Sequence, residues 1–285
     1  MKTTFLSPAE LAPHQNDPNW RVIDCRFDLA KPGWGREDYA RAHIPGAVFA
    51  DLNLELSSPI TPATGRHPLP DPEAFIELMC RLGISNQTQV VVVDTAAGAF
   101  AARLWWMLSC WFEHPSVAVL EGGFTRWQHE GYPVASGSET PPRGNFSRNP
   151  QSNCYVTAAE VNALRHNTQY RLIDARSPER YRGESEPIDR LAGHIPGAVN
   201  RPHTQNLARG GLLEQPETLR QQFLDLLAGL PASQAIVYCG SGVTSCFHLV
   251  TMQHIGLPGS RLYVGSWSEW IGDPKRPIAI GSDPG

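Results

Sequence analysis

Long apolar runs are missing from this sequence. No stretch of roughly 18 apolar residues, the length that crosses a bilayer as a helix, occurs in the chain of 285 residues. The first residues, MKTTFLSPAELAP, contain no apolar run of signal-peptide length. With 41% hydrophobic and 18% charged residues, the composition is that of a soluble globular chain. We therefore expect a cytoplasmic protein that has no membrane partner.

An excess of positive charge and an organised set of cysteines are also missing. The 24 Lys and Arg residues against 28 Asp and Glu give a net charge of −4, so we expect no nucleic-acid partner. The cysteines form no CxxC pair and no Cys/His spacing of a zinc site, so no zinc site is expected. We expect no other metal and no organic cofactor. They are scattered along the chain: Cys25, Cys80, Cys110, Cys154, Cys239 and Cys246.

An internal duplication is present instead. Five blocks of the first half return in the same order in the second half, at offsets between 143 and 151 residues: FLSPAEL and YVTAAEV, VIDCR and LIDAR, AHIPGAV and GHIPGAV, VVVD and IVYC, GGFTRW and GSWSEW. The stretch between the halves is rich in Ser, Pro, Asn and Gly and lacks periodicity. We predict an N-terminal domain over residues 1–138, a linker over 139–153 and a C-terminal domain over 154–285.

The same fold class is predicted for both halves. Ser7-x-x-Glu10 and Thr157-x-x-Glu160 have the form of capping boxes that open helices. Apolar runs rich in β-branched residues read as buried strands over 21–25, 171–175, 89–94 and 235–239, and helical patterns alternate with them. Such alternation predicts an α/β fold in which each domain is a parallel sheet with helices on both faces. Ligands of such sheets bind beyond the carboxyl ends of the strands.

The sharpest local signal is the stretch IVYCGSGVTS, in which Cys239 follows a predicted strand. Gly240 and Gly242 let the backbone curl and turn its N–H groups inward. A helix is expected after Thr244, with its positive end toward the sulfur. These features should lower the pKa of the Cys239 thiol and stabilise a bound anion. The first half has Asp94 at the matching position, so only the second half is expected to be catalytic.

These motifs resemble the tandem-domain rhodanese family over essentially the whole chain. The two HIPGAV blocks mark the domain type, and CGSGVT with GSWSEW is similar to the catalytic half of the family. The resemblance implies two tandem rhodanese-like domains and a sulfurtransferase that carries sulfur as a Cys239 persulfide. Members that use thiosulfate have basic residues just after the cysteine. Here Gly240 and Ser241 are uncharged, which is similar to members that use 3-mercaptopyruvate, while thiosulfate stays open as the alternative donor.

The resemblance also implies roles for individual residues. Arg180, in ARSPERYRGE, matches the arginine that binds the substrate anion, and Arg190 is the nearest match to a second one. Ser241 matches a serine that works with a histidine and an aspartate of the first half, for which His67 and Asp51 are the candidates. The two histidines of the HIPG blocks read as structural. The loop residues assigned to substrate binding are Gly240, Gly242, Val243 and Thr244.

The implied partners are a small sulfur donor and an acceptor, which is cyanide or a thiol such as thioredoxin. Two other classes compete with this interpretation. A cysteine phosphatase needs an arginine six residues after the cysteine, and Ser245 stands there. A non-catalytic binding or sulfur-carrier module suits the first half, with Asp94, but not the intact Cys239 loop.

Overall fold

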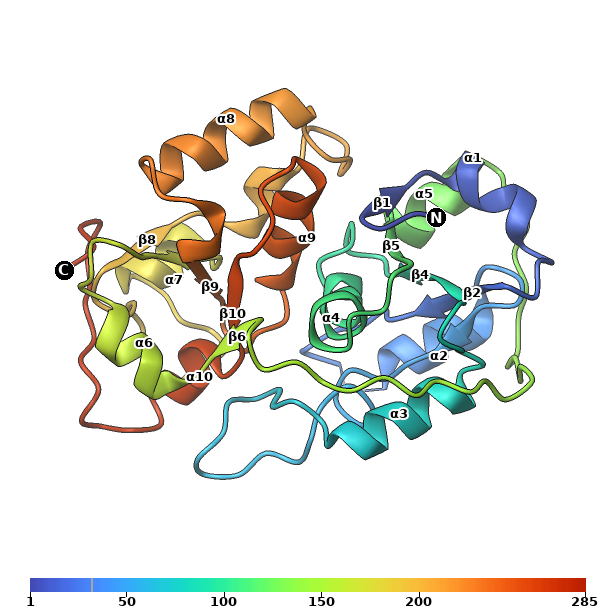
Figure 1. Cartoon of the computed structure of the whole chain (residues 1–285), viewed down its shortest axis with the longest axis horizontal. Helices are drawn as coiled ribbons and strands as arrows, with labels where there is room; N and C mark the ends of the chain where they lie inside the picture. The colour runs from blue at the N-terminus through green and yellow to red at the C-terminus, as the bar shows by residue number, and fades with distance from the viewer. Residues whose placement is uncertain (32) are drawn as a thin grey trace. The chain divides into compact units, whose positions relative to one another are not determined.

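The computed structural model describes residues 1–31 and 33–285. Its chain forms two compact units. Unit 1 comprises Met1–Ser58 and Leu69–Gln151, and unit 2 comprises Pro59–Pro68 and Ser152–Gly285. The short segment 59–68 thus belongs to unit 2, although it lies within the first half of the sequence (Figure 1).

Unit 1 is built on a parallel sheet in the order β1-β5-β4-β2-β3. A 3₁₀ turn at Ala12–His14 follows the first helix, and a π-helical turn at Met107–Trp111 extends the fourth. The described elements are β1 (Phe5–Leu6), α1 (Pro8–Leu11), β2 (Trp20–Asp24), α2 (Trp34–Arg41), β3 (Val48–Phe49), α3 (Pro72–Arg81), β4 (Gln89–Val93), α4 (Ala101–Trp106), β5 (Val117–Leu120) and α5 (Gly123–His129).

Unit 2 repeats this arrangement, with a parallel sheet in the order β6-β10-β9-β7-β8. Short 3₁₀ turns lie at His203–Asn206 and Ala232–Gln234. The described elements are β6 (Tyr155–Val156), α6 (Ala158–Leu164), β7 (Arg171–Asp174), α7 (Pro178–Arg182), β8 (Ala198–Asn200), α8 (Pro216–Leu227), β9 (Ala235–Tyr238), α9 (Cys246–His254), β10 (Arg261–Tyr263) and α10 (Ser266–Trp270).

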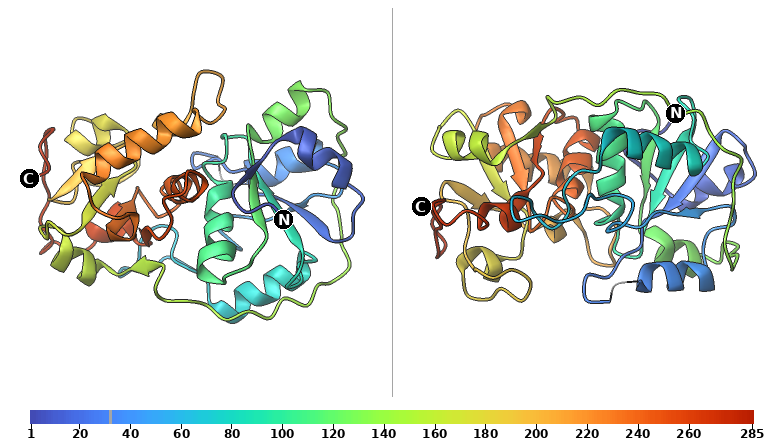
Figure 2. Two further views of the ribbon diagram at one scale, coloured as in Figure 1. Left: turned by 45° about the horizontal axis from the view of Figure 1, so that its top comes forward. Right: turned by 90° about the horizontal axis from the view of Figure 1, so that it is seen from below.

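Helices cover both faces of each sheet (Figure 2). Strand β4 shows why: all five of its residues are buried, and alternate side chains point to opposite faces. Val91 and Val93 join the core beneath α1 and α5, which includes Leu11 and Trp127. In unit 2 the corresponding core on one face gathers Ile236 and other side chains around Trp267 and Trp270. The predicted fold class, two parallel α/β domains, is confirmed.

The capping boxes and the histidines of the HIPG blocks have the local structure expected from the sequence. Both capping boxes form. The hydroxyl oxygens of Ser7 and Thr157 accept hydrogen bonds from the backbone N–H groups three residues later. In return, the carboxylates of Glu10 and Glu160 accept from the N–H groups of Ser7 and Thr157. The histidines of the two HIPG blocks are buried and tie turns to neighbouring chain. His43 Nδ1 lies 2.8 Å from the Tyr39 carbonyl, and His194 Nδ1 lies 2.8 Å from the Tyr181 carbonyl.

The stretch predicted as a linker contains no helix or strand, but much of it packs along unit 1. Gly144 donates from its N–H to the Cys80 carbonyl at 2.8 Å, and Phe146 is buried. Residues as far as Gln151 therefore group with unit 1. The division into domains 1–138 and 154–285, with a linker over 139–153, stays a prediction.

Candidate active site

Cys239 comes directly after β9, the middle strand of the unit 2 sheet. The residue is 2% exposed. The Ser245 hydroxyl donates a hydrogen bond to Cys239 Sγ at 3.4 Å, and the expected helix, α9, begins at the next residue. The sulfur therefore lies at the carboxyl end of a parallel sheet, where ligands of such folds bind.

The surroundings of Cys239 favour its thiolate. Burial by itself raises the pKa of the thiol because it disfavours charge. Hydrogen bonds from the hydroxyls of Ser245 and Thr244, and from the backbone N–H groups of Ser241 and Ser245, act in the opposite direction. Their combined effect lowers the pKa of Cys239 below its ordinary value. This direction is the one expected from the sequence, and the role of Cys239 as a nucleophile stays a prediction.

Helix α10, which carries the GSWSEW motif, holds the loop that begins at Cys239 by hydrogen bonds to its backbone. Ser266 Oγ accepts a hydrogen bond from the Cys239 N–H at 3.1 Å and donates one to the Tyr263 carbonyl at 2.8 Å. Trp267 and Ser268 donate from their N–H groups to the carbonyls of Cys239 and Gly240, at 3.0 and 2.9 Å. Ser266 holds a left-handed backbone, with φ at 54°, a conformation that is costly for a residue with a Cβ. The motif therefore positions the nucleophile.

Gly242 is required by the shape of the loop. Its φ of +74° favours glycine, and a Cβ built on it would collide with the carbonyl of Val264. Val243 is buried, and its carbonyl accepts from the N–H of Cys246 at 3.1 Å. The Thr244 carbonyl likewise accepts from Phe247, at 3.2 Å. The predicted binding roles of Gly240, Gly242, Val243 and Thr244 stay predictions.

Two guanidinium groups approach the loop at Gly240. A Cβ built on Gly240 would lie 2.7 Å from Arg66 Nη2 and 3.4 Å from Arg180 Nη2. Arg180 donates from Nε to both carboxylate oxygens of Glu186 at 2.9 Å, and from Nη2 to Asp189 Oδ2 at 3.0 Å. Arg66 forms an ion pair with the other carboxylate oxygen of Asp189. Asp189 therefore bridges Arg66 and Arg180 beside the nucleophile loop.

The predicted partnership of His67 and Ser241 is present as a contact. His67 Nδ1 lies 2.7 Å from Ser241 Oγ, and both residues are buried. His67 comes from the segment 59–68 and therefore belongs to unit 2. Its imidazole thus contacts the loop at Ser241, two residues after Cys239. The pair can pass a proton to or from a molecule bound beside Cys239.

Asp51 and Arg190, the other two predicted residues, have local contacts of their own. Asp51 belongs to unit 1, where its carboxylate accepts from the N–H groups of Asn53 and Leu54 at 2.9 and 3.1 Å. Arg190 donates from its guanidinium to the Ile271 carbonyl, just after α10. Their roles toward His67 and the substrate stay predictions.

Sequence reasoning missed several residues of the site. Arg66 directly precedes His67 in GRHPLP, and Ser266 lies inside the GSWSEW motif, so both were within quoted motifs. Ser245 was noted only because it is not an arginine. Glu186 and Asp189 lie between Arg180 and the second HIPG block, and charge alternation was the only signal they gave.

Unit 1 supplies an internal comparison for the loop. Asp94 follows β4 and is fully buried. Its Oδ1 accepts from the N–H groups of Ala96 and Gly98, both at 2.8 Å, and its Oδ2 from those of Phe100 and Ala101, at 2.8 and 2.9 Å. Backbone donors at this strand end thus surround an anion. In unit 2 the corresponding place belongs to the sulfur of Cys239.

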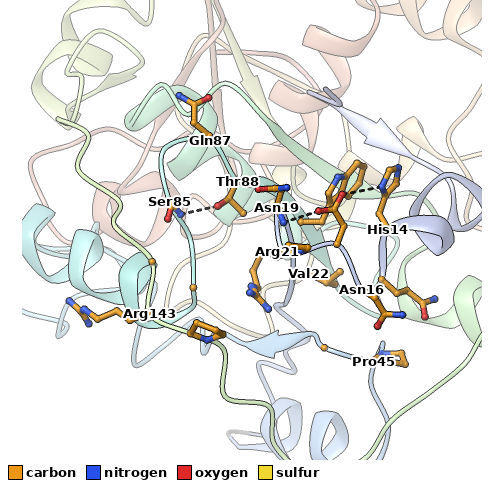
Figure 3. A pocket seen from close by; sticks show the side chains of 18 residues that line it. His14, Asn16, Asn19, Arg21, Val22, Pro45, Ser85, Gln87, Thr88 and Arg143 are labelled. Carbon is orange, nitrogen blue, oxygen red and sulfur yellow. Dashed lines mark hydrogen bonds and ion pairs between the residues drawn. The ribbon is translucent and has the colours of Figure 1, made fainter.

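A separate cavity of about 450 Å³ lies in unit 1. Figure 3 shows Arg21 and Arg143 among the polar side chains that line it, and the ring of His14 stacks on Trp20. It is located at the amino ends of β2 and β4, whereas Asp94 follows the carboxyl end of β4. This cavity therefore lies at the opposite end of the sheet from the loop that corresponds to the Cys239 loop.

In residues 1–31 and 33–285, no group of three or more His, Cys, Asp or Glu side chains is arranged to hold a metal ion. None of the helices in these residues is long and apolar enough to span a membrane.

Comparisons with known proteins agree with this geometry. The family model of the rhodanese-like domain matches residues 7–130 and 157–273. A probable 3-mercaptopyruvate sulfurtransferase of Pseudomonas aeruginosa is 43% identical over 278 residues, which cover 97% of this chain and 98% of that protein. A putative thiosulfate sulfurtransferase of Mycobacterium tuberculosis is 36% identical over 286 residues, which cover 98% of this chain and 97% of that protein.

A solved structure has the same fold throughout. The 3-mercaptopyruvate sulfurtransferase from Leishmania major matches with a TM-score of 0.85 and 32% identity, over 96% of this chain and 75% of that one. The resemblance inferred from the duplicated blocks and the CGSGVT loop is therefore confirmed, and the chain belongs to the rhodanese-like family.

Proposed function

We propose that this protein is a sulfurtransferase that takes sulfur from 3-mercaptopyruvate and carries it as a persulfide on Cys239. The Cys239 thiolate attacks the thiol sulfur of the donor, and a sulfur–sulfur bond forms. The carbon–sulfur bond of the donor breaks, and its electron pair stays on carbon as the enolate of pyruvate. A proton then converts the enolate to pyruvate. The product is a Cys239 persulfide, as expected for covalent catalysis with ping-pong kinetics.

One observation carries this proposal: a buried cysteine with a lowered pKa lies in a loop of hydrogen-bond donors. Such a loop stabilises both the attacking thiolate and the persulfide anion that replaces it. The internal comparison supports this view, because the equivalent loop of unit 1 surrounds the Asp94 carboxylate with four N–H groups. The 43% identity to a probable 3-mercaptopyruvate sulfurtransferase points to the same chemistry.

The proton for the enolate has a source in the site. Ser241 follows Gly240 in the loop, and its hydroxyl contacts His67 Nδ1. In our proposal this pair delivers the proton to the carbon that loses sulfur. The predicted participation of Asp51 belongs to the same proposal.

The charges around the loop favour a donor with one negative charge. Arg66 and Arg180 face two carboxylates, Glu186 and Asp189, so the positive charge of this group is already balanced. A keto acid needs hydrogen bonds for a single carboxylate, whereas the thiosulfate dianion gains most from unbalanced cations. Gly240 and Ser241 add no charge.

Thiosulfate remains the second candidate donor, since the Mycobacterium relative is named as a putative thiosulfate sulfurtransferase. The kcat/KM values for both donors, measured on one preparation with the same acceptor, decide between them. We expect the value for 3-mercaptopyruvate to be higher. A higher value for thiosulfate would contradict the proposed donor while leaving the Cys239 chemistry intact.

The second half-reaction passes the outer sulfur to an acceptor. We propose a thiol such as reduced thioredoxin, or cyanide, because both are nucleophiles that attack the outer sulfur and release the Cys239 thiolate. We also propose that the reaction takes place in the cytoplasm. Cys25 and Cys80 are free thiols, as is usual in a reducing compartment.

Peptide mass spectrometry tests the intermediate. After exposure to 3-mercaptopyruvate without an acceptor, the peptide that contains Cys239 should gain the mass of one sulfur atom, and cyanide should remove it. Cys239→Ser should show no gain, while Cys110→Ser should behave like the unaltered protein. A persulfide on another cysteine, or turnover by Cys239→Ser, would contradict the proposal.

A further inference from the structure

Arg66 lies at the Cys239 loop, and the resemblance to the rhodanese family gave it no role. Its Nη2 is positioned so that a Cβ on Gly240 would lie 2.7 Å away. Its side chain is 22% exposed and pairs with Asp189, which is 5% exposed. Arg66 therefore reaches from the segment 59–68 to Gly240, the residue that follows Cys239.

The segment 59–68 is anchored by its backbone as well as by the side chain of Arg66. The N–H of Arg66 already donates to Ser268 Oγ at 3.1 Å. The preceding residue, Gly65, packs so closely on α10 that a Cβ there would collide with the Gly265 carbonyl. Backbone contacts of two adjacent residues thus hold the segment beside α10 (Figure 1).

The Arg66 guanidinium also has hydrogen-bonding capacity left over. Its Nε is buried and has no hydrogen-bond partner in the described chain. A buried donor without an acceptor is costly, so Asp189 does not satisfy the whole guanidinium group of Arg66. Arg180 differs, since its Nε is fully used by both oxygens of Glu186.

Arg190, the second cation expected from the sequence, has a different environment. Its guanidinium donates to the Ile271 carbonyl after α10. By contrast, Arg66 and Arg180 share one carboxylate, Asp189, through its two oxygens. A ligand with two oxygens, such as a carboxylate, could bind both guanidiniums in the way that Asp189 does.

We propose, building on the sulfur-transfer function above, that Arg66 and Arg180 together bind the carboxylate of the sulfur donor, and that Asp189 positions the two guanidiniums for it. Arg66 thereby sets how tightly the donor binds, while Cys239 performs the chemistry. The segment 59–68 then supplies two site residues in a row: Arg66 for binding and His67 for proton transfer.

Steady-state kinetics with 3-mercaptopyruvate provide the first test. Loss of a charged hydrogen-bond partner should raise KM about tenfold or more in Arg66→Gln, with a smaller change in kcat. Arg66→Lys should recover part of the loss, because it keeps the charge without the planar fork. Arg182→Gln is the matched control: this arginine lies on α7 near Arg180 but pairs with Glu184. Thermal unfolding of each variant checks that the fold is kept.

A second test does not depend on the identity of the donor. Iodoacetate and iodoacetamide both alkylate a thiolate: the sulfur–carbon bond forms and iodide leaves. Only iodoacetate carries a carboxylate, so the ratio of its rate to that of iodoacetamide at Cys239, followed by peptide mass spectrometry, reports the anion site alone. We expect Arg66→Gln to lower this ratio about fivefold or more, and Arg182→Gln to leave it unchanged.

The outcomes separate the two proposals. If 3-mercaptopyruvate is not turned over but the alkylation ratio falls in Arg66→Gln, the donor assignment fails and the anion site stands. If turnover is normal and Arg66→Gln changes neither KM nor the ratio, the role of Arg66 is overturned while the function stands. If Arg190→Gln raises KM and Arg66→Gln does not, Arg190 is the second cation and the inference is wrong.

Discussion

Cys239 and Asp94 occupy the same place in the two units, directly after the middle strand. In unit 1 a carboxylate receives four backbone N–H groups. In unit 2 a thiol receives hydrogen bonds from hydroxyls and backbone. Hydrogen-bond donors surround both side chains, yet only a sulfur can form a persulfide. At the scale of the residue, therefore, we expect this one difference to decide which half is catalytic.

Ser245 should contribute to the reactivity of Cys239 through its hydroxyl, which donates to Sγ. In Ser245→Ala the thiolate loses this donor, so the pKa of Cys239 should rise. The midpoint of iodoacetamide alkylation against pH should then move upward by about one pH unit. Ser260→Ala is the control, since that hydroxyl donates to the Ala232 carbonyl instead. An unchanged midpoint in Ser245→Ala would show that the hydroxyl does not stabilise the thiolate.

Glu186 should act as a positioning residue for Arg180. Its carboxylate holds Arg180 Nε with both oxygens and also pairs with Arg176. Glu186→Gln keeps the shape but removes the charge, so Arg180 should be held less firmly. We expect KM for the donor to rise several-fold, by about 1 kcal/mol of binding free energy, with kcat nearly unchanged. An equal fall in kcat with no change in KM would indicate a role in the chemistry instead.

At the scale of the element, hydrogen bonds join the Cys239 loop and α10 into one structural unit. The N–H groups at the start of α10 bind the loop carbonyls, and Ser266 binds the Cys239 N–H. In unit 1, α5 does the same for the first loop, because Phe124 donates from its N–H to the Asp94 carbonyl at 2.8 Å. The repeated GGFTRW and GSWSEW blocks are therefore the supports of two equivalent loops.

Gly242 offers a test of how rigid this loop is. Gly242→Ala combines a left-handed backbone with a collision against the Val264 carbonyl. Gly210 also has a positive φ, +94°, but nothing lies within 4 Å of a Cβ built there. Gly210→Ala should therefore destabilise the protein by only about 1 kcal/mol, whereas Gly242→Ala should cost clearly more and reduce sulfur transfer. Urea unfolding of the two variants measures the difference, and equal losses would contradict the role of the Val264 contact.

Much of the secondary structure could be predicted from the sequence. Short apolar runs identified β2, β4, β7 and β9 within a residue or so, because short runs of β-branched apolar residues favour buried strands. The place of Cys239 followed from the strand end and the glycines. The pairing of Asp189 with Arg66 could not be predicted, since the two lie 123 residues apart in the sequence. Long-range ion pairs depend on the path of segment 59–68, for which the local pattern gave no signal.

At the scale of the whole molecule, buried histidines make stability depend on pH. His248 is fully buried; its Nε2 lies 2.7 Å from the Arg201 carbonyl, and its Nδ1 lies 2.9 Å from Asn206 Nδ2. One nitrogen donates and the other accepts, so the ring must be neutral. Burial is the main cause that lowers the pKa of His248 from 6.5 to about 3.

The sign of this dependence follows from the lowered pKa. The unfolded chain binds the proton at higher pH than the folded chain does, so the contribution of His248 is complete above pH 6.5 and is lost progressively as the pH falls from 6.5 toward 3. At about pH 5.5 the loss should be about 1.4 kcal/mol. Urea unfolding at about pH 7.5 and about pH 5.5, for the unaltered protein and His248→Gln, measures it. An identical pH dependence in both would contradict the assignment.

The path of residues 59–68 has a consequence for the history of the two halves. A duplicated gene usually leaves two copies that selection can separate, shuffle or lose one at a time. Here Arg66 and His67 are encoded in the copy that lacks the nucleophile, yet they belong to unit 2 beside Cys239. A lineage that discarded the first copy would lose two residues of our proposed catalytic apparatus along with it. Natural selection would therefore retain the copy without a catalytic cysteine, because it contributes residues to the proposed site of the other copy.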